Sequence, residues 1–493
     1  MKNYKFIMLF FLAFFFMFSC NEEKLEVVNP NQLSEGSFFQ TEDEFTAAVN
    51  AIYANLQSNQ MYNREYFFLH DLLSDEMVGN PQLEAHRRDL LEHNISPDNS
   101  IVVAVWTASY RTIHRANLVL AKLDEAPEDP NFTEAERNRL RGEALFLRAW
   151  SYYELVSLWG PVPKVTVPVS EITEEGFPRV SEEEIHALIF QDLATAEGFL
   201  PLKSQYASTE LGRATKGAAQ ALAGKVRMWT GEYPQAITEF QKVIDSDEYS
   251  IEDVPYIDNF TEENENNEES IFEVQFFPTG TGDAWSADGS GNAEVTFRGQ
   301  EYTPQAGWNN VDPNPDLVAA FEPGDIRYDA SFWLDGESFN GGQSTMSLGR
   351  PGWEKYSTVY KQPLENANSG INFRVIRYAD VLLMMAEAQN EVTGVANALP
   401  YVNMVRNRAG LPDLASADIS GEEAMFDIIV HERRIELAGE QIRNRDIRRW
   451  RREGKLDSEP IIYYESHHDL LPVPAVELLN NPALTLADQN AGY

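Results

Sequence analysis

The sequence predicts a mainly α-helical protein, in which tetratricopeptide-like helix pairs form a scaffold and a long, loop-rich insertion provides a ligand-binding region. Three stretches lead to this prediction. Residues 133–163 have the pattern of one long amphipathic helix, residues 214–245 have that of a helix pair, and residues 280–353 have no helical period. Because helix pairs of this kind bury a continuous core only by stacking on one another, a binding scaffold is expected.

The amino terminus has the features of a secretory signal peptide. Lys2 and Lys5 precede an apolar run over residues 6–18, which at about 13 residues is too short to span a membrane. Cys20 follows and is the only cysteine of the chain, at the place where a bacterial lipoprotein is cleaved and lipidated. We therefore predict that residues 1–19 are removed and that Cys20 carries an outer-membrane lipid. Met17 stands where the usual cleavage motif has leucine, which leaves an ordinary signal peptide with an incidental cysteine as the alternative.

Two helices are predicted in the segment that follows. Residues 25–37 have no period and are expected to form an extended arm on the body. Thr41 and Glu44 have the spacing of a capping box, in which each side chain satisfies a free amide at a helix start, and an apolar stripe follows them. Residues 71–98 mix charged and polar types and are predicted to form a surface loop, and residues 100–123 form the second helix.

The longest predicted helix begins at a second capping box, Thr133 with Glu136, and ends at Gly160 before Pro161. At about 3.6 residues per turn it makes roughly seven turns. Its apolar face carries Leu140, Ala144, Leu147, Ser151, Leu155 and Leu158, whereas Arg137, Arg141 and Arg148 are expected to lie mostly off this face.

Further helix pairs are predicted in the rest of the chain. Small residues over 214–230 allow close backbone approach, and residues 231–245 resemble half of a tetratricopeptide repeat and the opening of the next helix. The same organisation returns at 378–391 with 397–408, and residues 422–450 are predicted to form one more long helix.

The charge of the chain is strongly negative. Its 39 lysines and arginines against 78 aspartates and glutamates give a formal net charge of −39. A polyanionic partner meets repulsion over most of such a surface, so nucleic acid is not expected and a neutral polysaccharide is favoured over an acidic one. With 43% apolar residues the chain can bury a sizeable core.

The insertion is rich in tryptophan. Residues 259–270 are predicted to form an acidic loop and residues 271–277 a strand. Large aromatic residues in loops serve no helical stripe, so they are candidates either for ligand contacts or for packing the loop against the body; in the insertion these are Trp285, Trp308, Trp333 and Trp353. The tryptophans of the helical stretches are predicted to lie in the core, namely Trp150, Trp159, Trp229 and Trp450.

Seven blocks, in this order, resemble the SusD/RagB family of outer-membrane nutrient-binding lipoproteins. They lie at residues 37–56, 141–163, 231–245, 373–391, 402–411, 429–450 and 470–493. The resemblance implies a single SusD-like domain over 20–493, with a helical scaffold at about 41–250 and 374–452, a loop-rich ligand-binding region at about 254–373 and an extended segment over 453–493. Residues 21–24, Asn-Glu-Glu-Lys, resemble the acidic tag that directs Bacteroidetes lipoproteins to the cell exterior.

The resemblance also implies a function without a catalytic step or a cofactor. Family members bind oligosaccharides, less often peptides, and act as a lid on a TonB-dependent transporter of the SusC type. We therefore expect a lipid-anchored protein on the outer face of the outer membrane that captures a glycan, of a neutral glucan type. A peptide-capturing protein like RagB, a carbohydrate-active enzyme and a purely structural helical scaffold are the alternatives.

Candidate ligand contacts follow from the chemistry of sugars. Flat aromatic rings cover their apolar faces, and amide, carboxylate or guanidinium groups bind their hydroxyl edges. The insertion offers this mixture in Trp285, Asn292, Phe297, Arg298, Tyr302, Trp308 and Asn309. The loop after residue 71 offers Glu76, Asn80, Gln82, Glu84 and Arg87, and in the family ligand contacts tend to come from these two regions.

Other sites are disfavoured by the sequence. Residues 283–294 have the length of an EF-hand loop but lack its oxygen ligands and its glycine, so no metal site is predicted there. Residues 288–291 lack the spacing of a nucleophile elbow. The eight arginines of 431–452 alternate with glutamates and an apolar stripe, which indicates a structural helix with ion pairs. His467 and His468 are interpreted as surface or packing residues.

Overall fold

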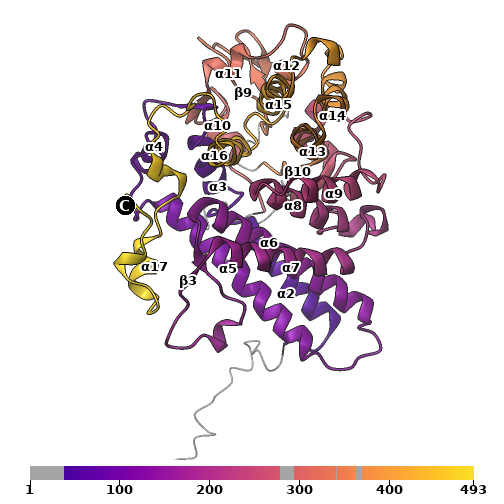
Figure 1. Cartoon of the computed structure of the whole chain (residues 1–493), viewed down its shortest axis with the longest axis vertical. Coiled ribbons are helices and arrows are strands. Elements are labelled where there is room, and N and C mark those ends of the chain that lie inside the picture. Colours follow the sequence, from indigo (N-terminus) through magenta and orange to yellow (C-terminus); the bar gives the residue numbers. More distant parts are fainter. Residues whose placement is uncertain (1–37, 278–293, 340, 359, 361–368) are drawn as a thin grey trace, which may run out of the picture.

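The computed structural model describes residues 38–277, 294–339, 341–358, 360 and 369–493, and this part of the chain is mainly α-helical, as predicted (Figure 1). The longer helices are α2 (Glu42–Leu56), α3 (Glu65–Leu72), α5 (Ser100–Asp124), α6 (Glu134–Trp159), α7 (Glu182–Phe199), α8 (Lys216–Trp229), α9 (Tyr233–Ile244), α13 (Tyr378–Thr393), α14 (Val395–Arg408), α15 (Glu422–Glu436) and α16 (Arg443–Arg452). Short helices are α4 (Ala85–Leu91), α10 (Arg298–Tyr302), α11 (Pro315–Ala319), α12 (Arg327–Ser331) and α17 (Ala475–Asn480).

The long helices stack in chain order. Each of α5 to α9 packs against the next, α9 packs against α13, and α13 packs against both α14 and α15, while α2 closes the other end on α5. The predicted pairs at 214–245 and 378–408 are thus confirmed as α8 with α9 and α13 with α14. In Figure 1 this stack runs from the purple helices at the bottom to the orange helices at the top, where the insertion also lies.

Both predicted capping boxes are present. The Thr41 hydroxyl accepts a hydrogen bond from the Glu44 amide, and Thr133 does the same for Glu136, while each glutamate side chain binds the cap backbone in return. Gly160 ends α6 with a φ of 71°, a conformation that costs glycine little.

Helix α6 is buried on more than the one face predicted for it. From Gly142 to Trp159 every residue is buried, because α2, α5, α7 and α8 surround the helix. Arg148, expected off the apolar face, is also buried, and its guanidinium binds both carboxylate oxygens of Asp192 at 2.7 Å. A buried arginine needs such a partner. Arg148 is therefore a charged residue in the sequence pattern of the helix that is nevertheless buried.

Two further predictions were wrong. Residues 422–450 are not one helix: α15 and α16 are separated by a turn in which Gly439 and Gln441 have φ values of 68° and 62°. Residues 71–98 are not a surface loop, since they contain strand β1 (Met77–Gly79), helix α4 and the buried carboxyl groups of Asp71 and Glu76. Helix α7, which begins after its N-cap residue Ser181, was not predicted from the sequence.

Strands occur only as short antiparallel pairs in the described residues. β4 (Ser270–Val274) pairs with β10 (Phe373–Arg377), so the two strands lie side by side at the beginning and the end of the insertion. β4 confirms the strand predicted at residues 271–277. The other pairs are β1 with β5 (Val311–Pro313), β2 (Val162–Pro163) with β3 (Arg179–Val180), β6 (Phe332–Trp333) with β9 (Gly352–Trp353), and β7 (Ser338–Phe339) with β8 (Ser344–Thr345).

The arginine-rich segment is structural, as predicted, but its ion pairs reach across the fold. Arg449 binds Glu387 at 2.5 and 2.7 Å. Glu436 accepts from Arg377 at 2.5 Å and from Arg327 at 2.9 Å, and both arginines come from the second half of the insertion or its end. The network therefore fastens the insertion to the helical scaffold, and these buried pairs lie between distant segments and not along one helix.

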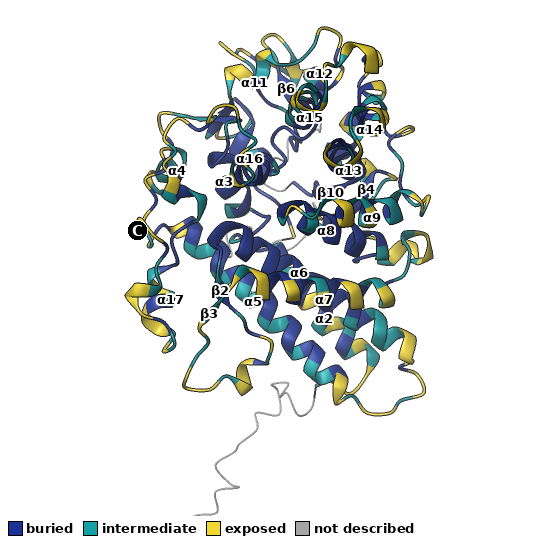
Figure 2. Ribbon diagram, in the orientation of Figure 1, coloured by how far each residue is buried: buried dark blue, intermediate teal, exposed yellow. Residues whose placement is uncertain are grey.

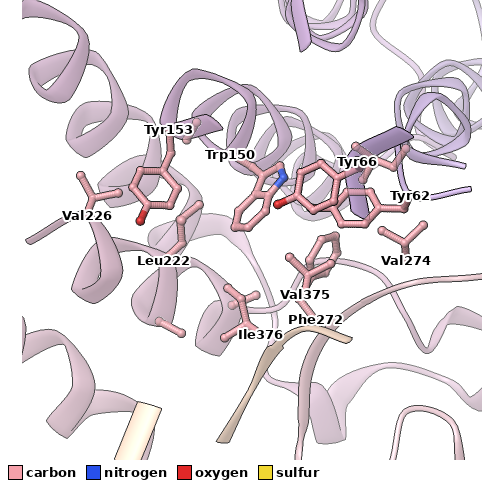
Figure 3. Packing of buried hydrophobic residues seen from close by; sticks show 14 of the residues in the cluster. Tyr62, Tyr66, Trp150, Tyr153, Leu222, Val226, Phe272, Val274, Val375 and Ile376 are labelled. Atoms are coloured by element: carbon pink, nitrogen blue, oxygen red, sulfur yellow. The ribbon is translucent and has the colours of Figure 1, made fainter. Parts of the chain in front are cut away.

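One large apolar core joins the scaffold to the base of the insertion. Figure 2 shows the buried residues along the middle of the helical stack, with exposed residues at the rims. In Figure 3, Trp150 and Tyr153 of α6 lie beside Leu222 and Val226 of α8, and the group continues to Tyr62 and Tyr66, to Phe272 and Val274 of β4 and to Val375 and Ile376 of β10. The predicted core tryptophans are confirmed, because Trp150, Trp159, Trp229 and Trp450 are all buried.

Candidate ligand-binding site

The two regions expected to supply ligand contacts lie against each other. β1 pairs with β5, with Met77 opposite Pro313 and Gly79 opposite Val311. Just beyond this ladder, the Asn80 side chain donates to the carbonyl of Asn309 at 3.0 Å, and its backbone amide donates to the carbonyl of Asn310 at 3.0 Å. Residues about 230 positions apart in the sequence are therefore held side by side.

Glu301 holds this junction together from inside. Its carboxylate is buried and accepts from Arg87 at 3.2 Å, and it also binds the side chains of Arg64 and Asn310. Arg64 precedes α3, Arg87 lies in α4 and Asn310 precedes β5, so one carboxylate connects three separate segments. Charge-assisted hydrogen bonds of this kind are short and directional, which fixes the segments relative to one another.

Among the described residues, Trp308 is the predicted insertion aromatic that lies accessible at the surface. Its side chain is 44% exposed, and its ring stacks on Phe297 with centroids 6.0 Å apart and an interplanar angle of 20°. The guanidinium of Arg64 lies 6.0 Å from the centre of the ring. A flat ring that is supported by its neighbours and still half exposed is suited to stack on the apolar face of a planar or ring-shaped ligand.

The turn before Trp308 is too tight for any other residue than glycine at position 307. A Cβ on Gly307 would lie 2.5 Å from the carbonyl oxygen of Gln300 and 2.8 Å from that of Thr303. The Trp308 amide donates to the same Gln300 carbonyl at 2.6 Å, and Asn309 follows with a φ of 51°, which asparagine tolerates better than most residues. The backbone thereby sets the direction of the ring.

Three of the predicted contacts are interior residues in the structure. Phe297, Arg298 and Tyr302 are 2%, 0% and 1% exposed. The Tyr302 hydroxyl donates to Asp71 at 3.0 Å, and the Arg298 guanidinium lies 3.3 Å from the centre of the Tyr302 ring. The mixture of aromatic and arginine residues expected at a sugar site here forms a buried cation–π stack. These residues support the loop from below and do not reach its surface.

The segment from Glu76 through β1 to α4 supplies both buried and accessible groups. Glu76 and Arg87 are buried, and burial raises the pKa of Glu76 to about 8, although its carboxyl group accepts from the Gly439 amide at 2.9 Å. Gln82 and Glu84 are exposed, and Asn80 is partly exposed. The accessible amide and carboxylate groups of these three side chains thus lie on the loop that Asn80 joins to the Trp308 turn.

The remaining tryptophans of the insertion differ in their environments. Trp333 and Trp353 are 7% and 0% exposed. Trp353 belongs to the main core and packs the insertion against the body, whereas Trp333 packs on Met346 within the insertion. Trp285 and Asn292 lie outside the described residues, as does most of the EF-hand-like stretch 283–294. The described residues contain no group of three histidine, cysteine or acidic side chains able to hold a metal. His468 is buried and His467 packs on Tyr493, in line with the packing role predicted for them.

Sequence reasoning missed two groups at this site. Arg64 belongs to a segment between predicted helices and carries no motif, so only its contacts with Glu301 and Trp308 reveal it. Phe277 is 58% exposed at the end of the strand region, and its amide donates to the Glu294 carbonyl at 2.5 Å. Three residues further along the chain is Phe297, on which Trp308 stacks, so the backbone connects the segment that holds Phe277 to this site.

Sequence comparison identifies related proteins over nearly the whole chain. A sequence model described as the SusD family matches residues 268–493, and one described as "Starch-binding associating with outer membrane" matches residues 24–228. The chain belongs to the SusD/RagB family. SusD-like protein P2 of Formosa agariphila is 28% identical to it over 100% of both chains.

Solved SusD structures share the fold of this SusD/RagB protein. A SusD superfamily protein of Bacteroides vulgatus superposes with a TM-score of 0.77 at 26% identity, over 92% of this chain and 100% of that one. A laminarin-binding SusD-like protein superposes with a TM-score of 0.76 at 27% identity, again over 92% of this chain and 100% of that one. In the described residues of the SusD/RagB chain, every helix is too short or too polar to cross a membrane.

Proposed function

We propose that this SusD/RagB protein is a cell-surface lipoprotein that captures a glycan of the neutral glucan class. Cys20 anchors it to the outer leaflet of the outer membrane, and the protein delivers the glycan as a lid to a TonB-dependent transporter of the SusC type. The observation that carries the proposal is the half-exposed Trp308 ring, stacked on Phe297 and joined through Asn80 to a loop of exposed polar side chains.

The class of glycan is proposed on two grounds. The related laminarin-binding SusD-like protein has the same fold over 92% of this chain, and laminarin is a neutral glucan. A formal net charge of −39 opposes an anionic polymer over most of the surface, whereas a neutral polymer is bound through ring stacking and hydrogen bonds without that penalty. Trp308 supplies the stacking surface, and Asn80, Gln82 and Glu84 supply hydrogen-bonding groups.

We propose that capture involves no catalytic step. Glycoside hydrolysis needs two carboxyl groups facing each other across a cleft at about 5 to 10 Å, with one kept protonated and both in reach of the sugar. Glu76 and Glu301, the buried carboxyl groups beneath the junction, are occupied by the Gly439 amide and by Arg64, Arg87 and Asn310. They stabilise the site from inside and do not open onto it.

Affinity gel electrophoresis tests the proposal directly. The mature chain, with Cys20 replaced by serine, is run through gels cast with laminarin, starch and an anionic polysaccharide. We expect retardation by a neutral glucan, lost in Trp308→Ala and kept in Tyr401→Ala, which removes a partly buried tyrosine of scaffold helix α14. A reducing-sugar assay on the same polymers should stay at background. Retardation by none of them would overturn the glucan assignment and favour the peptide-binding alternative.

A further inference from the structure

A small cavity of about 20 Å³ lies in the interior, where the arginine-rich helix α16 meets the scaffold. Its polar lining comes from four helices, α6, α8, α15 and α16, and its lining residues differ from those of the candidate ligand site. A cavity needs about 10 to 15 Å³ to hold one water molecule, so this one has room for a single small species. Phosphate, a carboxylate ligand and a sugar are all too large for it.

Three residues that line this cavity each have a buried N–H group without an acceptor among the described residues. These groups are Nε1 of Trp229, Nη1 of Arg433 and Nε of Arg445, from α8, α15 and α16. The three residues are 4%, 2% and 6% exposed. A buried donor without an acceptor is costly, so three of them around one cavity favour an occupant that accepts hydrogen bonds.

The other N–H groups of the two arginines are already held by carboxylates. Nε and Nη2 of Arg433 donate to the two oxygens of Asp446 at 2.7 and 3.0 Å. Nη2 of Arg445 donates to the carboxylate of Glu154. Because a guanidinium is planar, these bonds also fix the directions of the N–H groups that remain.

Tyr153 of α6, which also lines the cavity, contacts two of the three residues. Cζ of Arg445 lies 5.4 Å from the centre of the Tyr153 ring, and the centre of the Trp229 ring lies 6.4 Å from it. Arg433 joins this group through Asp446, which it binds and which lines the same cavity. The three donors therefore approach one small space from different helices.

The charges of the lining favour an anion over water. Each basic residue of the lining is paired with a carboxylate, and in the described part of the chain Asp446 is the acidic partner that also lines the cavity. Water would have to donate its own protons, yet the Asp446 oxygens already accept from Arg433 and Arg449. An anion accepts from all three donors and donates nothing. The basic residues of the lining are Lys225, Arg433, Arg445 and Arg449.

We propose that the cavity binds one halide ion, chloride under physiological conditions, through Nε1 of Trp229, Nη1 of Arg433 and Nε of Arg445. The ion connects α8 of the scaffold to α15 and α16, so the folded protein binds it and the unfolded chain does not. Stability then rises with the logarithm of the chloride concentration once that concentration exceeds the dissociation constant. The ion site is separate from the glycan site, and the inference does not rest on the proposed function.

Crystallography in bromide tests the site without a substitution in the cavity. The mature chain, with Cys20 replaced by serine, is purified and crystallised with bromide as its only halide, and anomalous data are collected at the bromine absorption edge. We expect an anomalous peak within hydrogen-bonding distance of Nε1 of Trp229 and Nη1 of Arg433. Water density in the cavity without an anomalous peak would overturn the proposal.

Urea unfolding measures the effect of the ion on stability, with chloride exchanged for gluconate at constant ionic strength. Trp229→Phe keeps an aromatic ring and removes the donor, so it should raise the dissociation constant for chloride about tenfold. Trp150→Phe is the matched control, because Trp150 is also buried with an Nε1 that lacks an acceptor among the described residues, but it lies outside the lining.

We expect chloride to stabilise the wild type and Trp150→Phe to the same extent, and Trp229→Phe only at higher concentrations. Stability of the wild type that does not change when chloride replaces gluconate would overturn the proposal. The same chloride dependence in all three proteins would also overturn it, because the effect would then not come from this cavity.

Discussion

Trp308 stacks on Phe297 with centroids 6.0 Å apart, so that an exposed ring rests on a buried one. Phe297 is 2% exposed and its amide donates to the Asn63 carbonyl at 3.1 Å, which ties it to the segment before α3. The rigid lower ring fixes the upper one, and a pre-positioned ring loses little conformational freedom when it binds. This relationship places the candidate ligand surface of the insertion directly on the scaffold.

Removing the upper ring should weaken glycan binding without unfolding the protein. We expect Trp308→Ala to cost about 1 to 3 kcal/mol of binding free energy, the scale for a stacked aromatic and its buried area. Calorimetry with the retarding glycan measures this, with Tyr401→Ala as the control. Unchanged affinity in Trp308→Ala would show that the ligand lies elsewhere; the same measurement on Trp285→Ala tests the prediction for a residue outside the described part of the chain.

The turn before the ring can be disturbed while the ring is kept. A Cβ at position 307 would lie 2.5 Å from the Gln300 carbonyl oxygen, so Gly307→Ala must shift the turn and reorient Trp308. We expect a loss of glycan affinity of about tenfold, or about 1.4 kcal/mol, with little loss of thermal stability. Gly349→Ala is the matched control in the same insertion, because a Cβ there meets no atom within 4 Å. Equal affinities for the two variants would contradict the role of the turn.

We expect the Glu301 carboxylate to contribute to the free energy of unfolding. Glu301→Gln removes the charge that compensates Arg64 and Arg87 at a buried position, and breaking a buried pair in this way costs about 3 to 5 kcal/mol. Urea unfolding measures the difference. The control is Asp124→Asn, which breaks the exposed pair with Arg141 and should cost below about 1 kcal/mol. A loss for Glu301→Gln no larger than for the control would mean that the junction is held by its other contacts.

The raised pKa of Glu76 leads to a prediction for how the stability of the folded protein depends on pH. Burial raises its pKa in the folded protein to about 8, far above the value for an exposed glutamate, so between about pH 4.5 and 8 the folded state binds more protons than the unfolded state. Its contribution to stability is complete below the unfolded pKa and is lost as the pH rises through 8. Glu76→Gln cannot ionise and keeps an acceptor for the Gly439 amide.

The comparison of wild type and Glu76→Gln isolates this effect. In urea unfolding from pH 5 to 8, the wild type should lose stability relative to Glu76→Gln by roughly 1 kcal/mol per pH unit. Glu84→Gln makes the same chemical change at an exposed position on the adjoining loop, and its stability should run parallel to that of the wild type. Parallel curves for wild type and Glu76→Gln would mean that the Glu76 carboxyl group is already ionised in the folded protein at pH 5.

Local signals determined much of the scaffold. The capping boxes at Thr41 and Thr133 and the stop at Gly160 depend on contacts within one or two turns, so the sequence alone indicates where those helices begin and end. The small residues of 214–230 likewise predict a closely packed helix, which is α8. The order of the seven blocks is also a property of the linear sequence, so it predicts the family without knowledge of the fold.

Only the tertiary structure decided which of the candidate residues face outward. Trp308 and Tyr302 look alike in the sequence, yet one is 44% exposed and the other 1%. Tyr302 is enclosed by Arg298 of its own short helix and by Asp71, which lies 231 positions away in the sequence. The break between α15 and α16 has the same cause: the Gly439 amide bonds Glu76 and its carbonyl bonds Arg298. Burial and pairing between distant segments depend on the whole fold, and local composition does not specify them.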